Sequence, residues 1–331
     1  MLYIGVRSIL LAGMDRDALC EYLERRLGPE MARQRMGIER EHEAQVFGQG
    51  LNWFHPENLA LSRRLIKAAL VSTGLYRRGL ENARAVRVTR NPVVSTRLPA
   101  QFDGFTLLHL SDLHLDMSED ITQRILALVE GCAYDACVMT GDYRAGTSGP
   151  YDATLAGMKR LREVLRGPVF AVLGNHDSVA MLPAIEGLGI RVLMNEFERV
   201  ERNGASIIIA GVDDAHFFRA DDVEKAASGC GLADYSILLS HTPEIYRRAV
   251  QAGFDLMLSG HTHGGQICLP WQVPVTLDSD LPRRFGAGAW RHKGMTGYTS
   301  RGASCSIIPV RFNCPPEITL HTLRAAARAD Q

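Results

Sequence analysis

The stretch Phe105-Thr-Leu-Leu-His-Leu-Ser-Asp-Leu-His114 begins as an apolar run typical of a buried strand and ends in two polar side chains, Asp112 and His114. A carboxylate and an imidazole two residues apart, on the loop that leaves a strand, can reach the same point in space. Together they suit a divalent metal ion. A lone Asp-x-His is more often a helix cap beside a hydrogen-bonded histidine, so the interpretation depends on whether the pattern recurs.

The apolar run recurs along the chain. Strands are predicted at 105–110, 135–140, 168–173, 206–212, 235–240 and 254–259, with helices such as 121–130, 154–165 and 243–251 between them. This alternation predicts an α/β architecture with parallel pairing in the middle. Residues 85–98 predict a leading edge strand bounded by prolines. Residues 305–310 and 317–323 predict short antiparallel strands that close a second sheet.

Ligand-type side chains follow five of these strands. In open α/β sheets, ligands bind beyond the carboxyl ends of the strands, so these side chains are expected to converge. They are Asp112, His114, Asp142, Asn175, His241, His261 and His263. Carboxylates, imidazoles and an amide oxygen suit Mn, Fe, Zn, Co or Ni, and the sequence does not choose among these metals. Seven ligands are too many for one ion that also holds water, and they fit two ions that share a carboxylate.

The ordered motifs Asp-x-His, Gly-Asp, Gly-Asn-His-Asp, His and Gly-His-Thr-His resemble those of the calcineurin-like metallophosphoesterase superfamily over residues 100–323. Gly260-His-Thr-His-Gly-Gly-Gln266 and the tail Arg311-Phe-Asn-Cys-Pro-Pro-Glu317 resemble its bacterial YkuE-like phosphodiesterase branch. The resemblance implies two mixed β-sheets packed face to face and flanked by helices, the four-layer sandwich of that superfamily. The remaining N-terminal residues predict a helical extension, with a break between helices near Gly28.

The resemblance also implies roles for individual residues. Asp112, His114 and His263 would hold one ion, Asn175, His241 and His261 the other, and Asp142 would bridge them. His176 would face the leaving group as the acid catalyst, and Asp177 is a candidate for orienting it. The arginines Arg144, Arg301 and Arg311 are candidate phosphate clamps. The Gly- and Pro-rich stretch 264–304 is expected to form loops over the metals.

The activity implied is phosphoester hydrolysis by attack of a metal-bound hydroxide, with a phosphodiesterase favoured. Ala145 stands where protein Ser/Thr phosphatases have an aspartate, which argues against a protein phosphatase. A pyrophosphatase acting on a nucleotide-activated lipid, of the UDP-2,3-diacylglucosamine type, would use the same chemistry. A non-catalytic scaffold on this fold would lack several of the ligands, whereas this chain has them all.

The composition indicates which classes of partner and which cellular location to expect. Lys+Arg and Asp+Glu are both 37 in 331 residues, so no overall basic field indicates nucleic acid. Seven scattered cysteines without a C-x-x-C favour a reducing, cytoplasmic location, and the apolar stretch 1–13 is too short to span a bilayer. We expect a helical extension over 1–84 and a catalytic domain over 85–331. The basic amphipathic segment 57–80 is either a solvated helix face or a peripheral contact with the inner face of the membrane.

Overall fold

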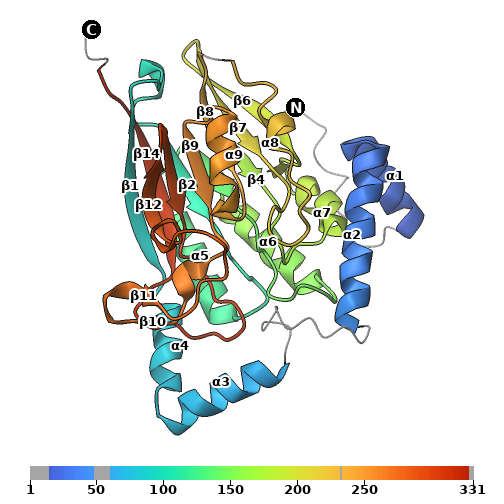
Figure 1. Cartoon of the computed structure of the whole chain (residues 1–331), viewed down its shortest axis with the longest axis vertical. Helices are drawn as coiled ribbons and strands as arrows, with labels where there is room; N and C mark the ends of the chain where they lie inside the picture. The colour runs from blue at the N-terminus through green and yellow to red at the C-terminus, as the bar shows by residue number, and fades with distance from the viewer. Residues whose placement is uncertain (1–14, 48–59, 232, 328–331) are drawn as a thin grey trace.

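Strand β2 (Thr106–Leu110) lies inside the first of two six-stranded mixed sheets that face each other (Figure 1). The computed structural model describes residues 15–47, 60–231 and 233–327. The strands of the first sheet, in spatial order, are β1 (Arg87–Ser95), β14 (Glu317–Ala325), β2, β3 (Ala136–Met139), β4 (Val169–Ala171) and β5 (Arg191–Val192). Those of the second are β12 (Gly288–His292), β13 (Met295–Thr299), β9 (Leu256–Ser259), β8 (Tyr235–Leu239), β7 (Ala205–Gly211) and β6 (Glu196–Arg202).

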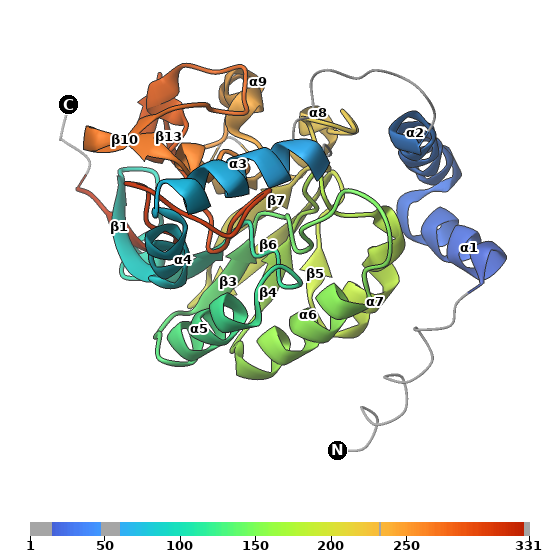
Figure 2. The same ribbon diagram turned by 90° about the horizontal axis from the view of Figure 1, so that it is seen from below.

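Helices cover the outer face of each sheet, which confirms the predicted sandwich. Over the first sheet lie α5 (Glu119–Glu130), α6 (Asp152–Val164) and α7 (Leu182–Gly187) (Figure 2). Over the second lie α8 (Val223–Ala226) and α9 (Tyr246–Gln251). Strands β2 to β5 are parallel, and so are β7, β8, β9 and β13. The carboxyl ends of each parallel set therefore meet at one edge of its sheet.

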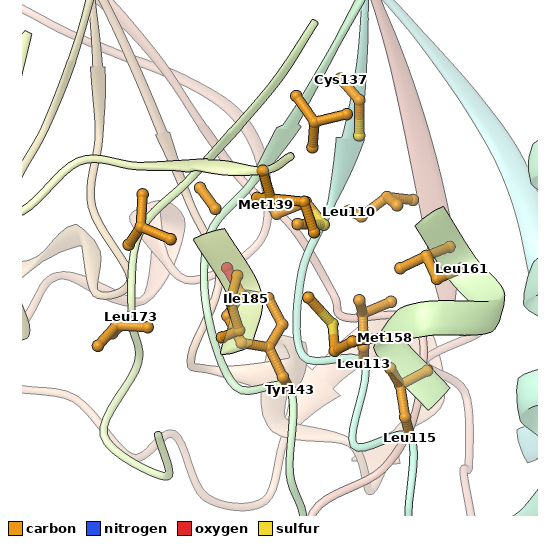
Figure 3. Close-up of a cluster of buried hydrophobic side chains, with 14 of the residues drawn as sticks. Leu110, Leu113, Leu115, Cys137, Met139, Tyr143, Met158, Leu161, Leu173 and Ile185 are labelled. Carbon is orange, nitrogen blue, oxygen red and sulfur yellow. The ribbon is translucent and has the colours of Figure 1, made fainter. Parts of the chain in front are cut away.

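Alternate residues of β2 serve two different cores. Leu107 packs between the sheets, whereas Leu108 and Leu110 pack under the helices of the first sheet. The core under the helices of the first sheet continues past the end of β2, where Leu113 and Leu115 lie beside Met158 of α6 (Figure 3). Leu113 and Leu115 anchor this loop in the core, and the side chains of Asp112 and His114, which lie before each of them, join the ligand cluster described below.

The helical N-terminal region begins with α1 (Arg16–Leu27) and α2 (Pro29–Phe47), separated at Gly28 as predicted. The predicted segment 57–80 contains α3 (Ala60–Ser72) and the start of α4 (Tyr76–Arg84), while its residues 57–59 lie outside the described part of the chain. The apolar stretch 1–13 also lies outside it. Within the described residues, no helix combines the length and hydrophobicity needed to cross a bilayer. The cytoplasmic location and the domain boundary at 84/85 stay predictions.

Three expectations for the C-terminal part were wrong. Residues 305–310 form bends rather than a strand. The segment predicted at 317–323 is β14, and it belongs to the first sheet, where it pairs antiparallel with β2 and parallel with β1. The stretch 264–304, predicted as loops, contains the short hairpin β10 (Cys268–Leu269) and β11 (Val273–Pro274) and also the paired strands β12 and β13. Gly297 of β13 lies so close to the indole of Trp290 that a Cβ there would be 2.2 Å from the ring, a contact that helical or apolar periodicity does not reveal.

Candidate metal centre

All seven predicted ligand side chains meet at the carboxyl-terminal edge of the two parallel sets. Ligand-type atoms of Asp112, His114, Asp142 and His263 lie within 4.8 Å of one another, and all four residues are buried. In this first group, His263 Nε2 is 3.5 Å from Asp112 Oδ1 and 3.3 Å from His114 Nε2.

The second group is built around the side-chain oxygen of Asn175. Asn175 Oδ1 lies 2.8 Å from His241 Nε2 and 3.1 Å from His261 Nδ1. Asp142 stands between the two groups, with Oδ2 at 3.9 Å from His114 Nε2 and Oδ1 at 3.4 Å from His241 Nε2. Its two oxygens therefore face different groups, which is the arrangement that a bridging carboxylate needs.

Backbone carbonyls fix the orientation of two imidazoles. His114 Nδ1 is 2.7 Å from the carbonyl oxygen of Arg144, and His241 Nδ1 is 2.7 Å from that of Thr140. Because a carbonyl can only accept, each Nδ1 carries a proton, and Nε2 is the atom turned toward the cluster. Histidines that bind metals are commonly held in this way.

His263 is held differently. Nη2 of Arg311, which can only donate, is 3.1 Å from His263 Nδ1. In the neutral ring, the proton then lies on Nε2 and points at His114 Nε2, 3.3 Å away. Burial lowers the pKa of both rings, that of His114 to about 4, so both are neutral. Binding of a cation by both Nε2 atoms requires this proton to leave and the Arg311 contact to yield.

The charge of the cluster calls for a cation. Asp112 and Asp142 are 0% and 2% exposed, and in the described part of the chain their ion pairs are all with histidine. Burial raises the pKa of Asp112 to about 6. Burial alone would lower the pKa of His241, but the facing Asp142 and Asp112 carboxylates raise it to about 10. Asp112 Oδ2 and His261 Nε2 are buried without a hydrogen-bond partner. The donor set therefore fits divalent metal ions.

The backbone at the site is strained. Five of the seven ligand residues have positive φ: Asp112 (52°), His114 (38°), Asp142 (58°), His261 (71°) and His263 (49°). Residues other than glycine adopt this region uncommonly, Asp and His more often than most, and such residues cluster at functional sites. The chain also passes very close to the carboxylates, since a Cβ on Gly174 would lie 2.3 Å from Asp142 Oδ1.

Asp177 organises these loops, a role that its place next to His176 did not reveal. Its carboxylate accepts hydrogen bonds from the backbone N–H groups of Asp142 (2.7 Å), Tyr143 (2.9 Å) and Gly174 (2.9 Å). The candidate role of orienting the His176 ring falls instead to Ala145, whose carbonyl oxygen is 2.9 Å from His176 Nδ1. His176 Nε2 is thereby directed to the cluster, 3.8 Å from Asp142 Oδ2.

The side chains of the three candidate phosphate-binding arginines contact other protein groups. Arg144 is buried and donates to the carbonyls of His176, Gly149 and Thr147. Arg311 is fully buried and donates to those of Ser304, His263 and Gly302. Arg301 pairs with Glu317 and donates to Gln272. These contacts hold loops around the site, and they do not favour the predicted role in phosphate binding, which stays a prediction.

A cavity of about 170 Å³ opens onto the cluster. Asp142, Asn175, His176 and the two histidines of the Gly-His-Thr-His motif line its floor. One wall is apolar and is formed by Ile66 of α3 with Ile267, Ile307 and Ile308. Among the described residues that line the cavity there is no lysine or arginine. Sequence reasoning also missed His216 and Asp278, whose ligand-type atoms lie within 4.8 Å of each other and of His261.

Comparisons with known proteins agree with this site. A family model described as calcineurin-like phosphoesterase matches residues 105–265, which include all seven ligand residues. YkuE of Bacillus subtilis, an uncharacterised metallophosphoesterase, is 31% identical over 261 residues, covering 76% of this chain and 89% of YkuE. The chain belongs to the calcineurin-like metallophosphoesterase family. Members of this family are generally metal-dependent hydrolases of phosphoesters.

Two further proteins resemble this chain over part of their length. A Bos taurus transmembrane protein with a metallophosphoesterase domain is 33% identical over 289 residues, which cover 80% of this chain but only 64% of that protein. Among solved structures, the NAD nucleotidase NadN of Haemophilus influenzae superposes with a TM-score of 0.40 and 15% identity, over 60% of this chain and 45% of that chain. A superposition at that level supports no argument about function.

Proposed function

We propose that this metallophosphoesterase is a phosphodiesterase that works with two divalent ions. The observation that carries the proposal is the position of Asp142, whose two oxygens face two separate groups of ligands. Asp112, His114 and His263 would hold one ion, and Asn175, His241 and His261 the other. When bound, such a pair of ions supplies Lewis-acid chemistry, since it neutralises charge on a phosphoryl group and acidifies water.

His176 is the residue that handles the proton of the leaving group. Its Nδ1 proton is donated to the Ala145 carbonyl, so Nε2 is the nitrogen presented to the cavity floor. A protonated Nε2 would donate to the departing oxygen. General acid catalysis of this kind is worth about 10²–10⁴-fold in rate.

The lining of the cavity supports a diester over a monoester. A monoester carries close to two negative charges at neutral pH, because its second pKa is about 6, whereas a diester carries one. The described lining residues supply no lysine or arginine for the additional charge, and Asp278 would oppose it. The apolar wall of Ile66, Ile267, Ile307 and Ile308 suits a second ester substituent of low polarity.

A pyrophosphatase acting on a nucleotide-activated lipid is the second candidate, and the same apolar wall favours it. Both candidates share the ion pair and His176, so they differ in substrate rather than in machinery.

The test is a panel of substrates and metals. Metal-stripped protein is reloaded with Mn, Fe, Zn, Co or Ni, one ion at a time, and assayed with bis-p-nitrophenyl phosphate and p-nitrophenyl phosphate. We expect faster turnover of the diester with at least one metal. Equal or faster turnover of the monoester would overturn the diesterase assignment. Release of a nucleoside monophosphate from UDP-2,3-diacylglucosamine, without diester cleavage, would favour the second candidate.

A further inference from the structure

Exposed apolar side chains are gathered at one end of the molecule. Eight large hydrophobic side chains are exposed in the described residues, and only Val94 lies outside two neighbouring segments. Leu65 and Val71 belong to α3, and Leu75 precedes α4. The others lie on or next to the β10–β11 hairpin: Leu269, Trp271, Val273 and Val275. Trp271, at the tip of this hairpin, is 93% exposed. Soluble surfaces seldom gather apolar side chains in this way without a partner.

The two segments form one surface, which we call the apolar–basic end (α3, α4 and the hairpin 268–275). Figure 1 places them together below the sheets, on the side where the strands of the metal centre end. Ile66 of α3 and Ile267 beside the hairpin line the same cavity. Arg78 of α4 and Trp271 of the hairpin line the same surface hollow. The clustering is therefore spatial as well as sequential.

The net charge of this end is positive. Residues 60–84 contain six arginines and lysines and one acidic residue, Glu81, which pairs with Arg77. Arg64, Lys67 and Arg78 are exposed beside the apolar side chains. The hairpin itself has no charged residue between Gln266 and Thr276. An exposed tryptophan, scattered aliphatic side chains and a basic helix are together the composition of a surface that lies in the interface of a lipid bilayer.

We propose that the apolar–basic end docks the protein on an anionic lipid surface. Trp271 and the aliphatic side chains would enter the boundary between head groups and acyl chains, and the basic side chains would face the anionic phosphates. A protein partner would be expected to bury a contiguous apolar patch and to match its charges with acidic groups. Here the apolar groups lie on helices that also carry exposed basic residues and on an uncharged hairpin tip, a combination that suits an anionic membrane.

Docking would also set the orientation of the cavity. Because Ile66 belongs both to α3 and to the wall of the cavity, the docked protein would hold the cavity mouth next to the lipid head groups. The substrate class then expected is an amphiphilic phosphoester presented at the membrane surface. This consequence depends on the proposed function, whereas docking itself does not.

The experiment measures binding of the whole protein to vesicles, without any assay of activity. Sedimentation is compared for vesicles of phosphatidylcholine alone and for vesicles with about one third phosphatidylglycerol, at low and high salt. We expect binding to the anionic vesicles that weakens at high salt. W271S and the double variant L65S/V71S should each weaken it about tenfold or more, because each loses buried apolar surface. The double variant R64E/K67E should abolish the preference for anionic vesicles.

Two matched controls test whether location matters. Val94→Ser removes an apolar side chain of β1 that is 50% exposed, close to the 55% of Val71. Arg166→Glu reverses an exposed charge just before β4, at the amino-terminal edge of that sheet. Both should bind like the unaltered protein, and all variants should keep its thermal unfolding temperature. Equal binding to neutral and anionic vesicles, no binding to either, or equal losses in the controls would overturn the proposal. So would a dimer in light scattering that W271S dissociates, since the surface would then serve self-association.

Discussion

Arg35 and Asp213 form a buried ion pair, with 2.8 Å between Nε and Oδ2 and with side chains that are 1% and 0% exposed. Arg35 belongs to α2 of the N-terminal extension, and Asp213 follows β7 of the second sheet. The guanidinium also lies 3.6 Å from the centre of the Phe218 ring. One turn further on, Glu39 accepts hydrogen bonds from Ser178 and from the backbone of Val179, just after the Asn-His-Asp motif. The extension is thus fastened to the loops of the metal centre.

Removing Arg35 should therefore destabilise the fold. Arg35→Met would leave the Asp213 carboxylate buried without its cation, which costs about 3–5 kcal/mol in the free energy of unfolding. Urea denaturation measures the change. Arg33→Met, on the same helix but with a side chain that is 72% exposed, is the control and should cost less than about 1 kcal/mol. Equal effects of the two variants would contradict the proposed importance of the buried pair.

Asp177→Asn should lower the metal content of the protein. The carboxylate that accepts three backbone N–H groups would be replaced by an amide that can turn a donor toward one of them. Misplacement of the loops that carry Asp142 and Asn175 is expected to weaken metal affinity about 10–100-fold. Metal analysis after dialysis measures this. Asp135→Asn, which alters an exposed carboxylate that accepts one backbone N–H, should leave the metal content unchanged.

His176→Ala should separate catalysis from metal binding. Turnover of the diester is expected to fall about 10²–10⁴-fold, because the group that protonates the leaving oxygen is lost. The metal content should stay near that of the unaltered protein, since Asp142 keeps its imidazole neighbours His114 and His241. Loss of the metals would show that His176 is a ligand rather than an acid.

Of two glycine-to-alanine substitutions, one should abolish metal binding and the other should stabilise the fold. A Cβ on Gly174 would lie 2.3 Å from Asp142 Oδ1 and 2.9 Å from His241 Cε1, so Gly174→Ala should displace two ligands and abolish binding of at least one ion. Gly37 lies within α2, where a Cβ would have no atom within 4 Å apart from the neighbouring backbone of its own helix, and Gly37→Ala should raise the free energy of unfolding by about 1 kcal/mol. Calorimetry with metal titration distinguishes the two. Full binding of two ions by Gly174→Ala would refute the assigned geometry.

Metal removal should lower thermal stability. The buried carboxylates of Asp112 and Asp142 lie in one cluster with His114 and His263, and a cation there would relieve the cost of their desolvation. A ligand present at 100 times its dissociation constant stabilises the folded state by about 2.7 kcal/mol. We therefore expect the unfolding temperature to fall after chelation and to recover on adding Mn²⁺ or Zn²⁺. An unfolding temperature indifferent to chelator would count against a metal centre.

Apolar runs in the sequence predict the parallel strands well, because strands covered on both faces need continuous hydrophobic residues. All six strands from 105–110 to 254–259 are present, within a few residues of the predicted bounds. The position of β14 could not be predicted in this way. Its pairing with β1 joins residues more than 200 positions apart, and no local pattern encodes such a partner.

The metal centre could also be predicted only in part from the sequence. Side-chain chemistry at the strand ends identifies the seven ligand candidates. The left-handed backbone of five of them, such as Asp112 and His263, does not follow from residue type alone, because most Asp and His residues have negative φ. The engagement of Arg144 and Arg311 with carbonyl groups is likewise a property of loop geometry. An arginine near a motif looks the same in sequence whether it binds phosphate or backbone.

The place of β14 between β1 and β2 has a consequence for biosynthesis. Of all the strands in the first sheet, this inner one is translated last. While the ribosome is still completing residues 317–325, the nascent chain already carries every proposed ligand, yet β2 has an unpaired edge and β1 has no neighbour. Open edges of this kind invite pairing with other chains. Premature termination just before Glu317 should therefore yield an aggregating polypeptide, and a chaperone that shields the gap would be needed most before residues 317–325 leave the ribosome.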